Sequence, residues 1–321
     1  MRLRATSLAL ILALPVPAAA LPLEDASSLI VFGDSLSDTG NLPGLIGPLA
    51  DVVVPSPPYF DYRRSNGPLW ADVAEDVAGA GANFAYAGAR AEGAGTSPIP
   101  IPDFEAQIGA YVGALAGGFD PGDSPLAAVW FGANDIFQSL GTPDLGDTIT
   151  AAVGAIGDGI DQLFALGIED FAVFNLPDLS ITPRFLGQSF AADASRTFND
   201  LLALEIAGAP GDVVGIDIEA LFDGFIADPS GFEDLYPPLE GIAVLDEPCV
   251  TGSFPGIDVC ADPERYAFYD AVHPTTDVHA AVALAFERSL SAEPSVVPLP
   301  AGAPLLVLGL GALAAVRRRR G

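Results

Sequence analysis

The N-terminal part of the chain reads Ser28-Leu29-Ile30-Val31-Phe32-Gly33-Asp34-Ser35, a short apolar run that ends in a glycine and two polar residues. An apolar run of this length, stopped by glycine, is typical of a strand buried on both faces of a sheet. Similar runs follow along the chain. They predict four further strands: Asn83–Ala87, Leu126–Phe131, Phe171–Phe174 and Val213–Ile218.

Segments with helical periodicity separate these runs. They predict helices at Leu69–Ala78, Phe104–Leu115, Ile149–Leu166, Arg196–Ile206 and His273–Leu290. Strands that alternate with helices are typical of a mainly parallel sheet covered by helices on both faces. The sequence therefore predicts one α/β domain over residues 21–291, with a ligand site beyond the carboxyl ends of its strands.

Acidic residues dominate the charge of the chain. Its 42 Asp and Glu residues face 13 arginines and no lysine, which gives a net charge of −29. A protein that binds nucleic acid needs a basic surface, so this function class is excluded. Half of the residues are apolar, so the acidic composition does not indicate disorder.

The N-terminus predicts an export signal. Arg2 and Arg4 precede the apolar run Leu8–Leu14, and small residues end the segment at Ala18-Ala19-Ala20. This order predicts a secretory signal peptide over residues 1–20. A buried N-terminal helix is the alternative interpretation.

The C-terminus predicts a second targeting segment at residues 298–321, after a linker at 292–297. The stretch Val296–Val316 carries no charge and is followed by Arg317–Arg320, as in a membrane span with a cytoplasmic stop. With Val297-Pro298-Leu299-Pro300-Ala301 it resembles the VPLPA/PEP-type sorting signals of Gram-negative bacteria. The resemblance implies export to the cell envelope, membrane contact through this segment, and cleavage by an exosortase-like protease that can release the protein. A plain one-span anchor is the alternative.

Cys249 and Cys260 are the two cysteines of the chain. An even count in an exported protein predicts a disulfide that closes a short loop. Two cysteines alone do not make a structural zinc site, and only His273 and His279 could assist. We therefore predict no metal and no cofactor.

Polar residues with catalytic potential follow three of the predicted strands. Ser35 follows the first strand, where a serine is exposed beside backbone N–H donors, as a nucleophile requires, although serine is also a common helix N-cap. Gly88 follows the second, where its backbone N–H can approach an oxyanion. Asn134 follows the third and can donate a side-chain N–H, although asparagine is also frequent in turns.

A base and its acceptor lie close together near the end of the domain. Serine needs a base that takes its proton, and that base must be held in one tautomer by an acceptor. Asp270 and His273 supply both within one turn. His279 lacks this arrangement, and we interpret it as a surface residue.

Several blocks of the sequence resemble the GDSL (SGNH) esterase/lipase family. In order, they are Gly33-Asp34-Ser35-Leu36, Gly88, Gly132-Ala133-Asn134-Asp135 and Asp270-Ala271-Val272-His273-Pro274. Residues 64–72, 81–85 and 260–269 are similar to the branch of plant GDSL lipases and secreted bacterial phospholipase/haemolysin-type enzymes. The resemblance implies a flavodoxin-like three-layer α/β/α fold, with hydrolysis of carboxylic esters through an acyl-enzyme.

The resemblance also implies the roles of single residues. Ser35 corresponds to the nucleophile, His273 to the general base and then acid, and Asp270 to its orienting partner. The oxyanion hole corresponds to the N–H of Ser35, the N–H of Gly88 and the side-chain amide of Asn134. Three aspartates receive structural roles: Asp34 and Asp38 fix the loop around Ser35, and Asp135 orients Asn134.

These observations predict an exported serine hydrolase that acts on an ester or lipid, as a lipase, esterase or phospholipase. A carbohydrate O-deacetylase and a thioesterase would share the same site. A surface adhesin or matrix-binding protein that keeps the fold without catalysis is the alternative from another class. Aromatic residues between 47 and 62 and the loop Pro229–Cys260 are expected to line the substrate pocket.

Overall fold

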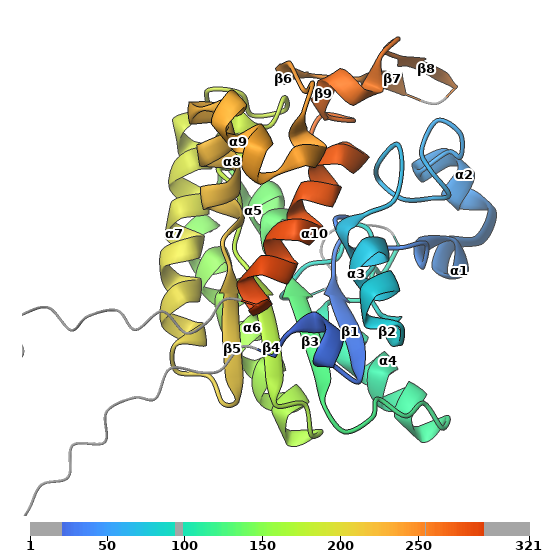
Figure 1. Cartoon of the computed structure of the whole chain (residues 1–321), viewed down its shortest axis with the longest axis vertical. Coiled ribbons are helices and arrows are strands. Elements are labelled where there is room, and N and C mark those ends of the chain that lie inside the picture. Colours follow the sequence, from blue (N-terminus) through green and yellow to red (C-terminus); the bar gives the residue numbers. More distant parts are fainter. Residues whose placement is uncertain (1–20, 94–98, 254, 292–321) are drawn as a thin grey trace, which may run out of the picture. The chain divides into compact units, whose positions relative to one another are not determined.

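The computed structural model describes residues 21–93, 99–253 and 255–291 (Figure 1). Within these residues, five parallel strands form the central sheet in the order β2-β1-β3-β4-β5. This is the strand order of the flavodoxin-like doubly wound fold, and it confirms the predicted α/β class. The strands are β1 (Ser28–Gly33), β2 (Gly81–Asn83), β3 (Pro125–Trp130), β4 (Asp170–Phe174) and β5 (Asp212–Ile216).

Helices and short strands complete the fold. The α-helices are α1 (Leu42–Ile46), α2 (Ala50–Val53), α3 (Trp70–Ala78), α4 (Phe104–Ala116), α5 (Ala133–Ser139), α6 (Leu145–Ala165), α7 (Ser189–Ile206), α8 (Ile218–Ala227), α9 (Pro229–Leu235) and α10 (Thr276–Ser291). The 3-10 helices are η1 (Leu23–Asp25), η2 (Gly47–Leu49), η3 (Leu179–Ile181), η4 (Pro237–Leu239) and η5 (Pro263–Arg265). The short strand β6 (Val244–Pro248) pairs with β9 (Tyr266–Phe268), and β7 (Val250–Ser253) pairs with β8 (Gly256–Val259).

The side chains of the strands show that helices cover both faces of the sheet. Phe32 of β1 packs against Phe104 of α4, with 5.6 Å between the ring centroids. Trp130 lies one position beyond the register partner of Phe32 and therefore faces the opposite layer. There Trp130 and Phe174 pack against Trp70 of α3. The core thus has two parts, with α3 and α10 packed together over one face and α4 beside α6 over the other (Figure 1).

Several predicted element boundaries differ from those of the structure: α6 begins at Leu145 and α7 at Ser189, before the predicted Ile149 and Arg196. Two further shifts concern the site. The second strand ends at Asn83, although Phe84 and Tyr86 still donate backbone hydrogen bonds to β1. The last helix begins at Thr276, so His273 lies in the loop before it. A residue that precedes proline is disfavoured in helical conformation, and Pro274 follows His273.

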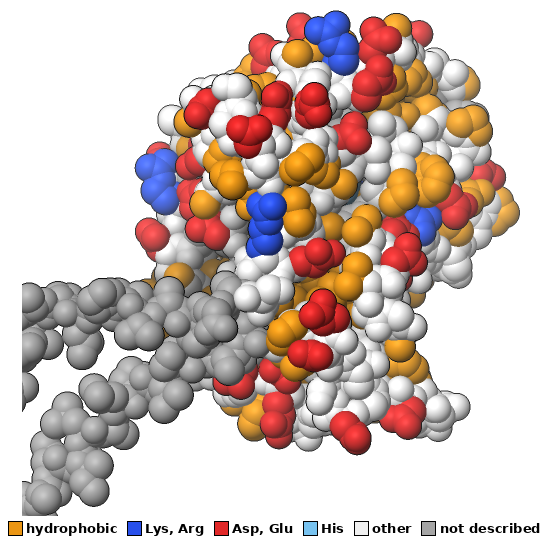
Figure 2. Space-filling model, in the orientation of Figure 1, with side chains coloured by type: hydrophobic (Ala, Val, Ile, Leu, Met, Phe, Trp, Pro, Cys, Tyr) orange, Lys and Arg blue, Asp and Glu red, His pale blue; other side chains and the backbone are white. Residues whose placement is uncertain are grey.

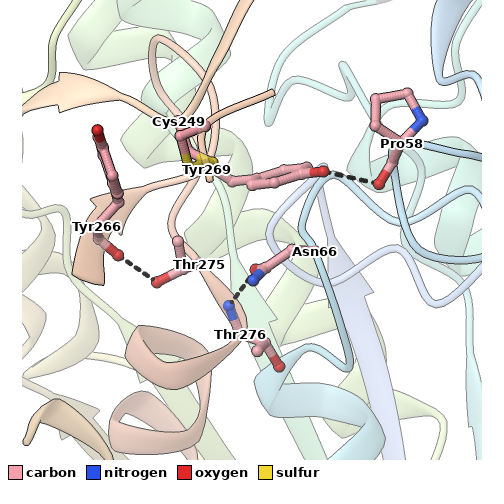
Figure 3. The surroundings of a disulfide bond; sticks show 8 residues. Pro58, Asn66, Cys249, Tyr266, Tyr269, Thr275 and Thr276 are labelled. Carbon is pink, nitrogen blue, oxygen red and sulfur yellow. Dashed lines mark hydrogen bonds between the residues drawn. A yellow bond between two sulfur atoms is a disulfide. The ribbon is translucent and has the colours of Figure 1, made fainter. Parts of the chain in front are cut away.

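The predicted disulfide between Cys249 and Cys260 is confirmed, with 4.9 Å between the Cα atoms (Figure 3). It closes the β7–β8 ribbon. The backbone N–H of Cys249 donates to the carbonyl of Phe268, and that of Val250 donates to the carbonyl of Tyr269. The ribbon is therefore fixed to the segment that leads directly into Asp270.

We expect the double variant Cys249→Ser/Cys260→Ser to have a free energy of unfolding lower by about 2–3 kcal/mol, because the unfolded chain loses a cross-link that closes a short loop. Urea titration of the variant and of the oxidised wild type measures the difference. A reducing agent should bring the wild type down to the level of the variant and leave the variant unchanged. Equal stability of oxidised wild type and variant would contradict this expectation.

In the part of the chain that the structure describes, no helix has the length and apolar character needed to cross a membrane. The predicted signal peptide at residues 1–20 and the predicted linker and sorting segment at 292–321 lie outside the described residues.

Candidate active site

Ser35 lies in the turn that follows β1, at the carboxyl edge of the sheet. A buried glutamine fixes the backbone just before it. Gln107 of α4 accepts the N–H of Gly33 at 3.0 Å and donates to the carbonyl of Gly33 at 2.9 Å. Gln107 was not predicted as a site residue from the sequence. Its one signal is a polar residue on the buried stripe of an otherwise apolar helix.

Ser35, His273 and Asp270 form a continuous chain of hydrogen bonds. Nε2 of His273 lies 2.8 Å from Oγ of Ser35, and Nδ1 lies 2.8 Å from both carboxylate oxygens of Asp270. An ionised carboxylate only accepts hydrogen bonds, so the network places the imidazole proton on Nδ1. Nε2 is then free to accept the hydroxyl hydrogen of Ser35, which is the tautomer that a general base requires.

Asp270 is held as an anion. Its Oδ1 accepts the backbone N–H groups of Val272 and His273, and its Oδ2 accepts the hydroxyl of Tyr59 at 2.8 Å. Burial pushes the pKa of Asp270 upward, but the electrostatic interaction and hydrogen bonds with His273, together with the backbone hydrogen bonds, outweigh it and hold the pKa below its ordinary value. Tyr59 was not predicted as a partner of Asp270 either, because it lies 211 positions from Asp270 and belongs to no motif.

The loop that carries Asp270 and His273 is tied to the segment around Pro58–Asn66. The hydroxyl of Tyr269 donates to the carbonyl of Pro58 at 2.7 Å, and the N–H of Thr276 donates to the side chain of Asn66 at 2.9 Å (Figure 3). Oγ of Ser65 donates to the carbonyl of Pro274. These bonds fix both ends of the loop that presents the imidazole.

Two backbone N–H groups are free at the predicted oxyanion hole. Within residues 21–93, 99–253 and 255–291, no acceptor binds the N–H of Ser35 or of Gly88, and both residues line one cavity. Gly88 has a φ of +87°, which favours glycine. As expected, Asp38 fixes this region, because its carboxylate accepts N–H groups from its own loop and, at 2.8 Å, from Ala87.

The side-chain amide of Asn134, which was predicted for the oxyanion hole, donates to two protein acceptors in the structure. Nδ2 donates to Oδ2 of Asp34 at 3.1 Å and to the carbonyl of Ala89 at 2.9 Å, so both of its N–H groups are engaged. The physical reason is the buried carboxyl of Asp34. Burial raises the pKa of Asp34 to about 7, and its oxygens are satisfied by Asn134 and the N–H of Leu36.

The predicted role of Asp135 is wrong. Asp135 does not orient Asn134, because consecutive residues on a helix point to different sides. It is buried and accepts Nε of Arg90 at 3.2 Å and the N–H groups of Ala91 and Glu92. Asp135 therefore fixes the loop that follows Gly88.

Ser35 and His273 line a cavity of about 200 Å³. Among the described residues, the lining contains none of the aromatic residues between 47 and 62 and none of Pro229–Cys260, so that expectation is wrong. The described residues of 229–260 form α9, η4 and the strands β6, β7 and β8 instead. Apolar side chains dominate the walls, and they come from β3, β9, several helices and the loop after β4: Trp130, Phe137, Leu176, Leu179, Phe222, Phe268 and Val282.

His279 is not a surface residue. Its side chain is 1% exposed on the stripe of α10 that also buries Val282 and Phe286. Burial lowers its pKa to about 3, so the ring stays neutral, and neither ring nitrogen has a partner among the described residues. The described part of the chain holds no group of three or more His, Cys, Asp or Glu residues suited to a metal ion.

Comparisons with known proteins place this geometry in context. The family model described as GDSL-like Lipase/Acylhydrolase matches residues 29–286. The chain is 27% identical over 305 residues to a phosphatidylcholine-sterol acyltransferase of Aeromonas hydrophila, covering 80% of this chain and 88% of that protein. It is 26% identical over 315 residues to the esterase EstA of Pseudomonas aeruginosa, covering 78% of this chain but 44% of that protein. Among solved structures, a catalytic mutant of an acetylxylan esterase from Geobacillus stearothermophilus is similar with a TM-score of 0.46 and 13% identity, covering 87% of this chain and 97% of that one.

Proposed function

Because the chain belongs to the family of GDSL-like lipases and acylhydrolases, we propose that it hydrolyses carboxylic esters through an acyl-enzyme formed on Ser35. The observation that carries this proposal is the unbroken chain of 2.8 Å contacts from Ser35 through His273 to Asp270. A base within hydrogen-bond distance of a hydroxyl, itself oriented by a third group, is the arrangement that activates a serine.

The reaction proceeds in two steps. Oγ of Ser35 attacks the carbonyl carbon of the ester while Nε2 of His273 takes the hydroxyl proton, and the carbonyl oxygen becomes an oxyanion. The oxyanion accepts the N–H groups of Ser35 and Gly88. His273 then gives its proton to the departing alcohol oxygen, which leaves an acyl group on Ser35. Water repeats the sequence, releases the carboxylic acid and restores the serine.

Asn134 joins the oxyanion hole when one of its side-chain N–H groups changes its acceptor from a backbone carbonyl to the oxyanion. Its amide lines the same cavity as Ser35 and Gly88 and donates one of its hydrogen bonds to a backbone carbonyl, that of Ala89. An oxyanion is a stronger acceptor than a neutral carbonyl, because charge-assisted hydrogen bonds are about twice as strong as neutral ones. The bond to Asp34 holds the amide in place while the second N–H turns from Ala89 to the oxyanion.

The walls of the cavity indicate an apolar acyl group. Aromatic and aliphatic side chains surround the space next to Ser35, and apolar surface of this kind favours the transfer of an acyl chain out of water. We therefore propose esters of fatty acids, including lipid esters, as the substrates. The relative named for phosphatidylcholine supports this substrate class.

A series of p-nitrophenyl esters from acetate to palmitate tests this function on the purified protein. We expect kcat/KM to rise from acetate as the acyl chain fills the apolar cavity, and to fall once the chain exceeds it. Hydrolysis of no ester in the series would contradict the proposed function. A preference for acetate over all longer chains would contradict the assignment of the cavity to the acyl group.

We also propose that the enzyme acts outside the cytoplasm. The order of charge and apolar residues at 1–20 and 298–321 supports export, and the disulfide is compatible with an oxidising compartment. Fractionation of cells that express the whole chain tests this point. Activity confined to the cytoplasmic fraction would contradict it.

The hydroxyl of Tyr59 predicts a measurable effect on turnover. We expect Tyr59→Phe to lower kcat about three- to tenfold and to leave KM nearly unchanged, because Asp270 loses one hydrogen bond that fixes it against His273. Steady-state kinetics with p-nitrophenyl butyrate measures the two constants. Tyr269→Phe is the matched control, since it removes a hydrogen bond to Pro58 and none to Asp270. A purely structural role would lower kcat equally in both variants, and that result would contradict the prediction.

A further inference from the structure

Two arginines at the cavity stand out against the acidic composition of the chain. Outside its two ends, the chain has seven arginines, and three of them, Arg63, Arg90 and Arg196, form ion pairs with aspartates. Arg64 and Arg184 line the cavity that contains Ser35 and His273. Neither has a carboxylate within ion-pair distance among the described residues.

Aromatic rings hold both guanidinium groups in position. Cζ of Arg64 lies 5.7 Å from the ring centroid of Tyr59, and Cζ of Arg184 lies 5.1 Å from that of Phe185 and 5.6 Å from that of Phe137. A ring face orients a guanidinium and leaves its charge and its N–H donors available for an anion. These two cations are therefore positioned but not neutralised.

Both arginines lie next to the loop that carries the imidazole. The backbone N–H of Arg184 donates to the carbonyl of Ala271, which lies between Asp270 and His273. Arg64 precedes Ser65, whose hydroxyl donates to the carbonyl of Pro274. Two segments far apart in the sequence thus bring positive charge to the same catalytic loop.

The other charges of the cavity do not cancel the two arginines. Asp34 is the carboxyl group among the described lining residues, and it already accepts hydrogen bonds from Leu36 and Asn134. On the face shown in Figure 2, acidic side chains are widespread and basic ones few, in keeping with 42 acidic and 13 basic residues in the chain. An anion that approaches this protein is repelled at long range, so its binding depends on short-range contacts with these arginines.

We propose that Arg64 and Arg184 bind an anionic group, a phosphate, sulfonate or carboxylate, on the alcohol side of the ester. This inference rests on the proposed function, because it names the substrate class of the same site. The acyl chain that suits the apolar walls carries no charge of its own, so the anion belongs to the leaving group. A guanidinium offers two parallel N–H donors that match the oxygens of such a group.

Two pairs of esters test the proposal. Phenyl butyrate and 4-sulfophenyl butyrate share their acyl chain and differ by one soluble anionic group. 1-Palmitoylglycerol and 1-palmitoylglycerol 3-phosphate make the same comparison for a lipid headgroup. The quantity measured is the ratio of kcat/KM for the anionic ester to kcat/KM for the neutral one. The ratio is compared between the wild type and each variant. The intrinsic difference in reactivity between the two esters is the same in every protein and therefore cancels in this comparison.

We expect Arg64→Gln and Arg184→Gln each to lower this ratio about tenfold, which corresponds to one charge-assisted contact. Arg288→Gln is the matched control: Arg288 also lies over a tyrosine ring and has no carboxylate partner within the described residues, but it lines a different cavity. It should leave the ratio unchanged. Arg184 is exposed, so its variant should fold even if Arg64→Gln does not.

A decrease confined to the glycerol pair identifies a lipid headgroup, and a decrease in the phenyl pair identifies a soluble anionic ester; either result supports the proposal. An unchanged ratio in both pairs for the arginine variants overturns it. Failure of the wild type to hydrolyse any of the four esters would instead contradict the proposed function. The two failures are therefore distinguishable.

Discussion

Replacing Ser35 with alanine is expected to lower kcat for p-nitrophenyl butyrate by about 10⁶-fold, the size of effect that follows loss of the nucleophile in a serine triad. The change removes the oxygen that His273 contacts at 2.8 Å. What remains is the contribution of substrate binding and of the backbone N–H donors, which stabilise the attack of water only weakly. The fold should persist, because the substitution removes a single atom from a turn.

The chain supplies a matched control for this variant. Gly122-Asp123-Ser124 repeats the three residues Gly-Asp-Ser but precedes β3, away from the imidazole. Ser124→Ala should keep the activity of the wild type. Loss of activity in Ser124→Ala, or full activity in Ser35→Ala, would contradict the assignment of the nucleophile.

Replacing Asp270 with asparagine is expected to lower kcat by about 10⁴-fold. The amide is similar in size, but it turns an N–H donor toward Nδ1 of His273 or presents one neutral oxygen in place of the anion. The imidazole then loses the partner that keeps the proton on Nδ1 and stabilises the imidazolium. Single-turnover acylation with p-nitrophenyl butyrate isolates this step.

Asp277→Asn is a suitable control for the loss of one negative charge nearby. Asp277 lies in the first turn of α10, seven positions beyond Asp270, and forms no hydrogen bond to His273. Its variant should acylate at the rate of the wild type. A loss of less than tenfold in Asp270→Asn would show that Asp270 does not orient the base.

The sequence predicted the sheet well because parallel strands buried on both faces are unbroken apolar runs. Two such runs can be recognised from the sequence alone, Phe171–Phe174 and the run that ends at Phe32. Each forms a strand of the sheet. β2 was placed less well, since it has three residues and only partly buried side chains. Its position depends on pairing with β1, which no local pattern records.

The difference between local patterns and tertiary contacts also decides which site residues can be predicted from the sequence. Ser35, Asp270 and His273 lie in short local motifs, so each could be proposed before the fold was known. Gln107 and Tyr59 act across 74 and 211 positions of the chain, and only tertiary structure brings them to their partners. His279 was misjudged for the same reason, because the packing of α10 on the sheet decides its burial.

The oxyanion hole shows that a sequence motif does not determine which partners its side chains bind. The motif Gly132-Ala133-Asn134-Asp135 indicates a donor and an acid side by side, but helix geometry turns them to different partners. Asn134 binds Asp34, and Asp135 holds the loop after Gly88. Which hydrogen bond a side chain makes depends on the neighbouring loops, and the spacing of a motif does not contain that information.

The central claim is that Ser35 becomes acylated, and trapping the enzyme with a p-nitrophenyl alkylphosphonate tests it most directly. We predict stoichiometric release of p-nitrophenol, an intact mass increased by one phosphonyl group, and a modified peptide that contains Ser35. Ser35→Ala should show none of the three, and a protein that keeps this fold only for binding should also fail to react. Suppose that the protein, after treatment with the phosphonate, carries no phosphonyl group on Ser35 and still hydrolyses esters. That result would contradict the account.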